Sequence, residues 1–228
     1  IVGYVHSWNP IDPIHDPNHA VKRGHLDKSL PHFDLLVFGS PHSLERSSKF
    51  GIQFSSEIAV IPPAISDVFI TGTQSIEDSD GEYGLFIGRL DDNKNIEQLI
   101  EAIQEVHDDL RLKIIGDGPL REEIQAQLDL KGEQCRCELL GWMSPVDFLP
   151  ILQNADFLCV PSNYESFGMV YVEALCSGVP VIGYAPSIDF IEQQLGLRCG
   201  IGLANQSAEH IMYAIQEIKS IGLDKEKV

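Results

Sequence analysis

The stretch from Tyr83 to Lys94 reads YGLFIGRLDDNK, a short apolar run that ends at a glycine before the chain turns polar. An apolar run of this length between turn residues predicts a buried β-strand, and the residues from Asn95 to Val106 continue with the spacing of a helix. The same order of strand, turn and helix recurs downstream. Such an alternation is typical of a parallel sheet with helices on both faces.

Working outward from this unit, we predict a complete doubly wound α/β domain over residues 83–228. Its strands are expected at Gly84–Ile87, Leu112–Ile115, Glu138–Leu140, Phe157–Val160 and Pro180–Gly183. Its helices are expected at Asn95–Val106, Leu120–Leu130, Pro145–Gln153, Gly168–Cys176, Ile188–Leu195 and Ala208–Ile218.

Upstream of Tyr83 the pattern is thinner. Strands are expected at Ile1–His6, Leu35–Phe38 and Glu57–Ile61, and helices near Ala20–Leu30 and Pro41–Phe50. Because so few strands cannot make a self-sufficient doubly wound domain, we expect the chain to begin partway through a first domain, of which residues 1–66 are the C-terminal remnant. The adjacent prolines Pro62 and Pro63 and the acidic run from Thr71 to Glu82 have the composition of a linker, which we place at residues 67–82.

Composition narrows the function classes. The 228 residues carry 34 acidic against 16 basic side chains, a formal charge of −18, which repels nucleic acid over most of the surface and makes it a poor partner. The five cysteines form no C-x-x-C pair and indicate buried thiols of a reducing compartment. Because no membrane span or secretion signal is found in the sequence, we expect the protein in the cytoplasm.

Two cations follow the strand at Tyr83. Arg89 and Lys94 stand in the loop after Gly88, at the carboxyl end of the strand, where open α/β sheets bind their ligands. In a chain this acidic, two cations at such an edge suit a diphosphate. The alternative is that both are solvated surface charges, although a lysine at the start of a helix opposes the helix dipole.

The pair Gly116 and Gly118 ends the next strand. Glycines let the backbone turn sharply and approach a ligand, but a tight strand-to-helix turn without ligand contact is the slightly favoured interpretation.

The longest constellation runs from Pro161 to Leu175. A loop with Glu165 leads to a helix that starts near Gly168, where free amides can bind an anion. Glu173 is the only charge between Glu165 and Asp189 and stands among apolar residues, so its carboxylate needs a hydrogen-bond donor such as a ligand's vicinal hydroxyls. The alternative is that it marks the solvated face of the helix.

From about Asp34 to Ser220 the sequence resembles the retaining glycosyltransferases of family 4, which have the GT-B fold of two Rossmann-like domains. Glu165 and Glu173 stand in the E-x7-E spacing of that family, within the similar string E-S-F-G-x-V. The other matching motifs appear in the family's order: Gly88-Arg89-Leu90 with Lys94, Gly116-Asp117-Gly118-Pro119, Leu140-Gly141 and Ala155-Asp156.

The resemblance implies a role for each matching residue. Arg89 and Lys94 look like the pair that neutralises the donor diphosphate, beside Gly88 and Gly118. Glu165 looks like the acid that binds the transferred sugar, and Glu173 like the one that takes the ribose hydroxyls. Three further matches complete the resemblance. The backbone amides of Phe167, Gly168, Met169 and Val170 would hold sugar and phosphate, and main-chain atoms of the turn Gly141-Trp142-Met143 would read the nucleobase. His6 would match the histidine that the first domain points into the cleft.

Departures from the family also matter. Its glycine-rich N-terminal loop is missing, and the residues from Gly183 to Asp189 replace a Gly-Gly turn followed by Glu. The acceptor side is almost wholly missing. We therefore expect the chain to bind the donor, while sugar transfer by this chain alone stays an open question.

The resemblance therefore predicts a metal-independent hexosyltransferase that uses a nucleoside diphosphate sugar and no cofactor. The acceptor is an unknown carbohydrate, lipid or small molecule, and peripheral membrane contact through the missing N-terminal region is left open. Two alternatives remain, a non-catalytic nucleotide-sugar-binding module and a GT-B-fold sugar-nucleotide epimerase. A metal site at His15 and His19 is disfavoured, because Pro13 and Pro17 argue against the helix that would pair them.

Overall fold

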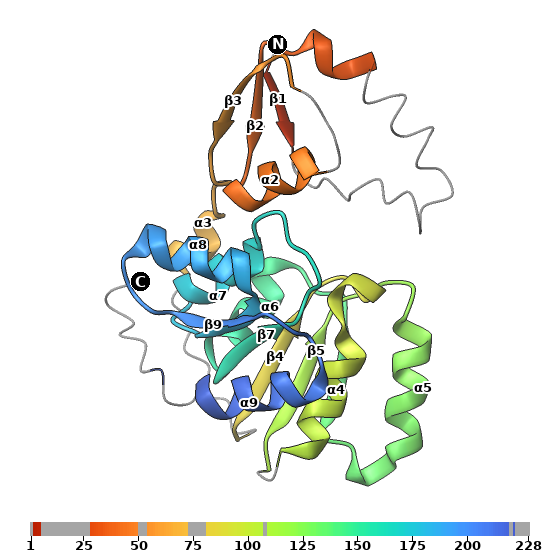
Figure 1. Cartoon of the computed structure of the whole chain (residues 1–228). Helices are drawn as coiled ribbons and strands as arrows, with labels where there is room; N and C mark the ends of the chain where they lie inside the picture. The colour runs from red at the N-terminus through yellow and green to blue at the C-terminus, as the bar shows by residue number, and fades with distance from the viewer. Residues whose placement is uncertain are drawn as a thin grey trace. The chain divides into compact units, whose positions relative to one another are not determined.

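The computed structural model describes residues 2–5, 28–49, 54–72, 81–106, 109–218 and 221. The chain divides into two compact units, both seen in Figure 1. One consists of Ile1–Ala64 with Glu165–Phe167, and the other of Ile65–Tyr164 with Gly168–Val228. The domain limits expected from composition, at residues 66 and 82, stay a prediction.

The first unit is a small parallel sheet. Strands β1 (Val2–Val5), β2 (Leu35–Phe38) and β3 (Glu57–Val60) pair in that order, with the 3-10 helix η1 (Leu30–His32) and helix α2 (Pro41–Lys49). Leu36 and Phe38 of β2 form its core with Leu30. The strands and α2 are as predicted. Most of the predicted helix at residues 20–30 lies outside the described residues; at its end Lys28 and Ser29 are helical, as predicted, and Leu30 begins η1.

The second unit contains a parallel sheet with the order β6-β5-β4-β7-β8-β9. Its strands are β4 (Tyr83–Ile87), β5 (Arg111–Ile115), β6 (Cys137–Gly141), β7 (Phe157–Val160), β8 (Val181–Tyr184) and β9 (Gly200–Leu203). The order reverses between β4 and β7, so the chain winds outward in both directions from these two strands. This reversal creates the crevice at which open α/β sheets bind ligands.

Helices connect the strands of this sheet as the sequence predicts. They are α4 (Ile96–Glu105), α5 (Arg121–Lys131), α6 (Pro145–Gln153), α7 (Met169–Cys176), α8 (Ala185–Leu195) and α9 (Ala208–Ile218), with the 3-10 helices η2 (Asp92–Lys94) and η3 (Gly132–Gln134). Figure 1 shows α4 and α9 side by side, and the Gln98 side chain of α4 accepts a hydrogen bond of 3.0 Å from the Ala208 amide. Within the described residues, no helix combines the length and apolar composition that a bilayer span requires.

The apolar runs become the core because the central strands are covered on both faces. Every residue of β7 and the residues Tyr83–Phe86 of β4 are buried. Each large apolar side chain buried in this way contributes about 1.5 to 3 kcal/mol relative to exposure. The apolar run from Tyr83 to Ile87 therefore lies at the centre of the second unit.

Two helices differ from the prediction. Helix α3 (Asp67–Thr71) lies in the stretch with linker composition, and its Phe69 is buried with its ring centroid 5.8 Å from that of Phe148. One apolar anchor is enough to dock so short a helix, and composition does not reveal it. Helix α8 begins at Ala185 and not at Ile188, because Pro186 occupies its first turn, where proline is accepted.

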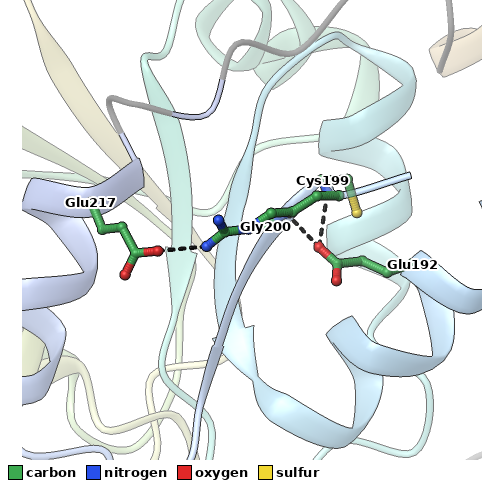
Figure 2. Close-up of polar contacts among 5 residues, drawn as sticks. Glu192, Cys199, Gly200 and Glu217 are labelled. Carbon is green, nitrogen blue, oxygen red and sulfur yellow. Dashed lines mark hydrogen bonds and ion pairs between the residues drawn. The ribbon is translucent and has the colours of Figure 1, made fainter. Parts of the chain in front are cut away.

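Strand β9 was not predicted at all, because two of its four residues are glycines. A side chain from another element holds it. The Glu192 carboxylate of α8 accepts hydrogen bonds from the Cys199 and Gly200 amides, at 2.8 and 3.1 Å, as Figure 2 shows. The exposed pair between Arg198 and Glu217, 2.5 Å apart, lies beside it.

These two glutamates should contribute unequally to stability. We expect Glu192→Gln to lower the free energy of unfolding by about 1.5 to 3 kcal/mol, because charge-assisted bonds to two backbone amides are weakened at once. Glu217→Gln is the matched control and should change it by less than about 0.5 kcal/mol, because exposed ion pairs are screened by water. Urea denaturation of the two variants measures both values, and equal losses would contradict the role assigned to Glu192.

Candidate functional site

The carboxyl ends of β4, β5 and β6 surround a cavity of about 680 Å³ in the second unit. Its lining combines apolar side chains with exposed backbone: Ile87, Gly88, Arg89, Ile115, Gly116, Asp117, Gly118, Trp142, Met143, Pro145 and Phe148. The volume is within the range of small-molecule sites, and the position is the ligand-binding edge of an open sheet.

The floor of this cavity is backbone because two loops touch without side chains between them. A Cβ atom on Gly116, whose φ is +152°, would lie 1.8 Å from the Gly88 carbonyl oxygen, and one on Gly118 would lie 2.3 Å from that of Leu90. The amides of Gly88 and Leu90 donate to the carbonyls of Ile115 and Asp117, at 3.0 and 2.9 Å. The two glycines therefore allow the loops to pack closely, which is the interpretation that the sequence slightly favoured. The same packing places Gly118 in the cavity wall.

Arg89 is the cation of the cavity lining. Its side chain is 68% exposed, and its Nε lies 3.2 Å from Asp91 Oδ2. Because this contact uses Nε, the two terminal nitrogens of the guanidinium remain available to donate a pair of hydrogen bonds to phosphate oxygens.

Lys94 is half-buried, and its Cε lies 3.7 Å from the position that a Cβ of Gly88 would take. It is the last residue of η2 and precedes Asn95, the N-cap of α4. Lys94 therefore stands one residue before the N-cap of α4, and its charge still lies beside the positive end of that helix dipole, as the sequence predicts. Its closeness to Gly88 is what supports a ligand role.

Helix α7 starts at a position that only glycine suits. Gly168 is the N-cap with φ of +90°, and a Cβ there would lie 2.3 Å from the ring of Tyr171. Tyr171 is fully buried and donates from its hydroxyl to the Val160 carbonyl at 2.8 Å, which fixes the helix to the end of β7. No side chain caps α7, so the amides of its first turn remain suited to an anion.

Glu173 is half-buried in α7, and burial raises the pKa of its carboxyl group above the usual range. Among the residues that the structure describes, none donates a hydrogen bond to this carboxylate and no cation pairs with it. A carboxylate that loses water without gaining a donor costs stability. This finding disfavours the simple solvated-face interpretation.

The loop residues Glu165–Phe167 are grouped with the first unit. The Glu165 carbonyl lies 3.1 Å from His42 Nε2, and the Ser166 carbonyl accepts a hydrogen bond from the Ser40 hydroxyl. Burial lowers the pKa of His42, although the contact with the Glu165 carbonyl opposes this shift. These bonds use the backbone of the loop and leave the role of the Glu165 carboxylate a prediction.

The structure brings part of the predicted site together. Gly88, Arg89, Gly118 and Met143 line one cavity. Gly168, Met169, Val170 and Glu173 lie at the start of α7 and along it, in the same unit, while Glu165 and Phe167 group with the other. His6 and the segment with His15 and His19 lie outside the described residues, and in the part described no three His, Cys, Asp or Glu side chains gather as metal ligands.

The sequence assigns the turn Gly141-Trp142-Met143 to the nucleobase through its main-chain atoms, but it does not predict the aromatic wall to which the Trp142 side chain belongs. Trp142, which is 71% exposed, lies in the same lining as the buried Phe148. An exposed tryptophan that follows the glycine at the end of β6 was the available signal, because large exposed aromatics often mark contact surfaces. A flat apolar wall of this kind suits a planar ring such as a nucleobase.

Comparisons with known proteins agree on a family. The sequence model of the family "Glycosyl transferases group 1" matches residues 73–224. An uncharacterized glycosyltransferase of Methanocaldococcus jannaschii is 37% identical over 105 residues, which are 46% of this chain and 29% of that protein. The D-inositol 3-phosphate glycosyltransferase of Corynebacterium diphtheriae is 30% identical over 65% of this chain and 39% of its own length. The matches thus span well under half of these relatives.

Solved structures show the same fold. Sucrose-phosphate synthase from Thermosynechococcus elongatus superimposes with a TM-score of 0.77 and 21% identity, over 99% of this chain and 59% of that one. The HepE protein of Anabaena, in complex with UDP and glucose, gives a TM-score of 0.73 and 19% identity, over 99% and 62% of the two chains. The predicted α/β fold of the GT-B type is thereby confirmed.

Proposed function

The chain belongs to the glycosyl transferases of group 1, and on that premise we propose that it binds a nucleoside diphosphate sugar and supplies the donor site for sugar transfer. One observation carries this proposal. A cavity with a backbone floor, an aromatic wall and an arginine lies at the carboxyl ends of β4, β5 and β6, beside the point where the strand order reverses. The HepE structure, which holds UDP and glucose, supports the same ligand class.

The arrangement suggests which part of the donor each wall binds. The nucleobase stacks near Trp142 and meets the backbone of Met143, and the diphosphate lies toward Arg89 and Lys94. The amides at the start of α7 add a partial positive charge for the same phosphates. The transferred sugar is assigned to Glu165 by the resemblance to family 4 alone.

The chemistry follows from this electrostatic arrangement. Breaking the bond from sugar to phosphate leaves charge on the diphosphate, and fixed cations and amides stabilise that charge without a metal ion. The acceptor attacks from the face that the leaving group occupies, so the anomeric configuration is retained, and positioning supplies much of the rate. We assign transfer of a hexose by this retaining mechanism, as in family 4. The five free thiols support a place in a reducing compartment such as the cytoplasm.

A thermal-shift screen of the chain against UDP-, GDP- and ADP-sugars tests donor binding and identifies the nucleobase. The expected result is a concentration-dependent rise of the melting temperature for one nucleotide class, because a ligand that binds only the folded state stabilises it. No shift with any of these donors would contradict the proposal.

Removal of either cation should separate phosphate recognition from base recognition. We expect Arg89→Ala and Lys94→Ala each to weaken nucleoside diphosphate binding about 10-fold and to leave nucleoside affinity unchanged. This loss stands at the lower end of the range for hydrogen bonds to charged groups, because the Arg89 side chain is exposed. Titration calorimetry in excess EDTA measures both ligands and excludes a bridging metal. Arg111→Ala, at the amino end of β5, is the matched control, and equal losses for both ligands would contradict the assignment.

A further inference from the structure

Three asparagines connect the loops on either side of the strand-order reversal. Asn93 and Asn95 belong to the β4–α4 loop, and Asn163 belongs to the β7–α7 loop. We call these three residues the asparagine tie. β4 and β7 are adjacent in the sheet, although helices α4, α5 and α6 separate them along the chain. The contact between their loops is therefore a product of the fold.

The bonds of the tie run in both directions between the loops. The Asn163 amide donates to the Asn93 carbonyl at 2.8 Å, and Asn93 Nδ2 donates to the Tyr164 carbonyl at 3.0 Å. Asn95 Nδ2 donates to the Pro161 carbonyl at 2.9 Å. Two longer bonds of 3.4 Å join Asn163 Nδ2 to Asn95 Oδ1 and to the Asp92 carbonyl.

Asn95 adopts a backbone conformation that needs an explanation. Its φ of +49° makes it the one non-glycine residue with positive φ in the described part of the chain. Asparagine tolerates this region better than most residues, but glycine would fit it with less strain. A glycine could not reach the Pro161 carbonyl.

The side chain of Asn95 also gives up its usual local role. Asn95 is the N-cap of α4, where asparagine normally accepts a hydrogen bond from the first helical turn, yet its side chain makes no capping bond. It reaches instead to the β7–α7 loop. Local stability of α4 is therefore exchanged for a bond between the two loops.

Lys94 stands between two anchored residues. The side chains of Asn93 and Asn95 both donate to carbonyls of the β7–α7 loop, so the backbone on either side of Lys94 is held to a separate strand. We propose that the asparagine tie is a positioning device that fixes Lys94 toward the diphosphate of the donor. This proposal rests on the proposed function, and the three asparagines need not touch the ligand.

The physical gain is preorganisation. A lysine on an untethered loop loses conformational freedom when it binds phosphate, and a fixed backbone removes part of that cost before the ligand arrives. The tie should thus raise affinity for the phosphate-bearing ligand alone. The nucleoside part meets the wall formed by β6 and α6, which the tie does not contact.

The test compares Asn95→Gly with the unaltered chain. Glycine keeps the positive φ and removes the bond to Pro161, so the fold should persist. We expect about 3- to 10-fold weaker binding of UDP, GDP or ADP, whichever the unaltered chain binds, and unchanged affinity for its nucleoside. Asn93→Ala, which removes the bond to Tyr164, should act in the same direction, and Asn205→Ala, which removes a side-chain bond before α9, is the control.

A double-mutant cycle distinguishes positioning from general stability. In a Lys94→Ala background the Asn95→Gly change should have no further effect on diphosphate affinity, because the group it positions is gone. Additive losses, or equal losses for nucleoside and diphosphate, would overturn the tie while leaving the proposed function intact. If the unaltered chain bound none of the three diphosphates, the proposed function would fail, and the tie with it.

Discussion

Gly116→Ala is expected to lower the free energy of unfolding by about 4 kcal/mol, the sum of strain at a disfavoured φ and of forced overpacking. The new methyl group would lie 1.8 Å from the Gly88 carbonyl oxygen, which is backbone and cannot rotate away. Relief requires the two loops to separate. That movement breaks the bond from the Gly88 amide to the Ile115 carbonyl at the end of the β4–β5 pair.

The same change should abolish donor binding, because Gly88 and Gly116 both line the cavity. Gly132→Ala is the matched control. It also has positive φ, +54°, but a Cβ there meets nothing within 4 Å, so only the conformational cost of about 1 kcal/mol should appear. Denaturant titration of both variants measures the difference, and a Gly116 variant no less stable than the Gly132 variant would show that the loops are not in close contact.

The fold was largely predictable because burial and sequence spacing agree in the second unit. The apolar runs at Tyr83 and Phe157 become its central strands, and the helices between them begin close to the expected residues. β9 was missed because its glycines weaken the strand pattern and because Glu192, which holds it, belongs to another element. A long-range hydrogen bond of this kind leaves no local signal.

The site was predictable where a motif coincides with a strand end. Gly88, Arg89 and Gly118 follow strands, and a parallel sheet places such residues at one edge. The asparagine tie could not be found in this way, because it depends on the adjacency of β4 and β7, which the order of strands along the chain does not state. The aromatic wall could not be predicted either, because it depends on how the turn after β6 directs the Trp142 side chain toward the cavity.

Glu173→Gln should leave the fold intact and weaken every nucleoside-bearing ligand. If the carboxylate accepts hydrogen bonds from two ribose hydroxyls, nucleoside, nucleotide and sugar nucleotide should all bind about 100-fold more weakly, since half-buried charged bonds stand at the upper end of their range. Glu101→Gln, on the exposed face of α4, is the control and should change none of these affinities. Titration calorimetry with the three ligands measures the pattern.

Although Glu173→Gln should weaken ligand binding, it should increase the stability of the ligand-free protein. Because burial raises the pKa of Glu173 in the folded state, the folded protein holds a proton that the unfolded chain has already released, and stability falls as pH rises from the usual glutamate pKa through the raised value. At pH values above this window the carboxylate is charged and costs stability. Glu173→Gln should therefore raise the melting temperature of the ligand-free chain above the window and flatten its decline across it.

Glu165→Gln should differ from Glu173→Gln, because only the transferred sugar is assigned to its loop. It should spare nucleoside diphosphate binding and reduce affinity for the sugar-bearing donor. In a protein that turns over it should also lower kcat, because the contacts tighten toward the transition state.

The two expectations for Glu173 belong together. A carboxylate that destabilises the ligand-free protein but binds the ribose is the signature of a functional residue. If Glu173→Gln instead lowered the melting temperature and left donor affinity unchanged, the carboxylate would be structural, and the ribose would have to be bound elsewhere.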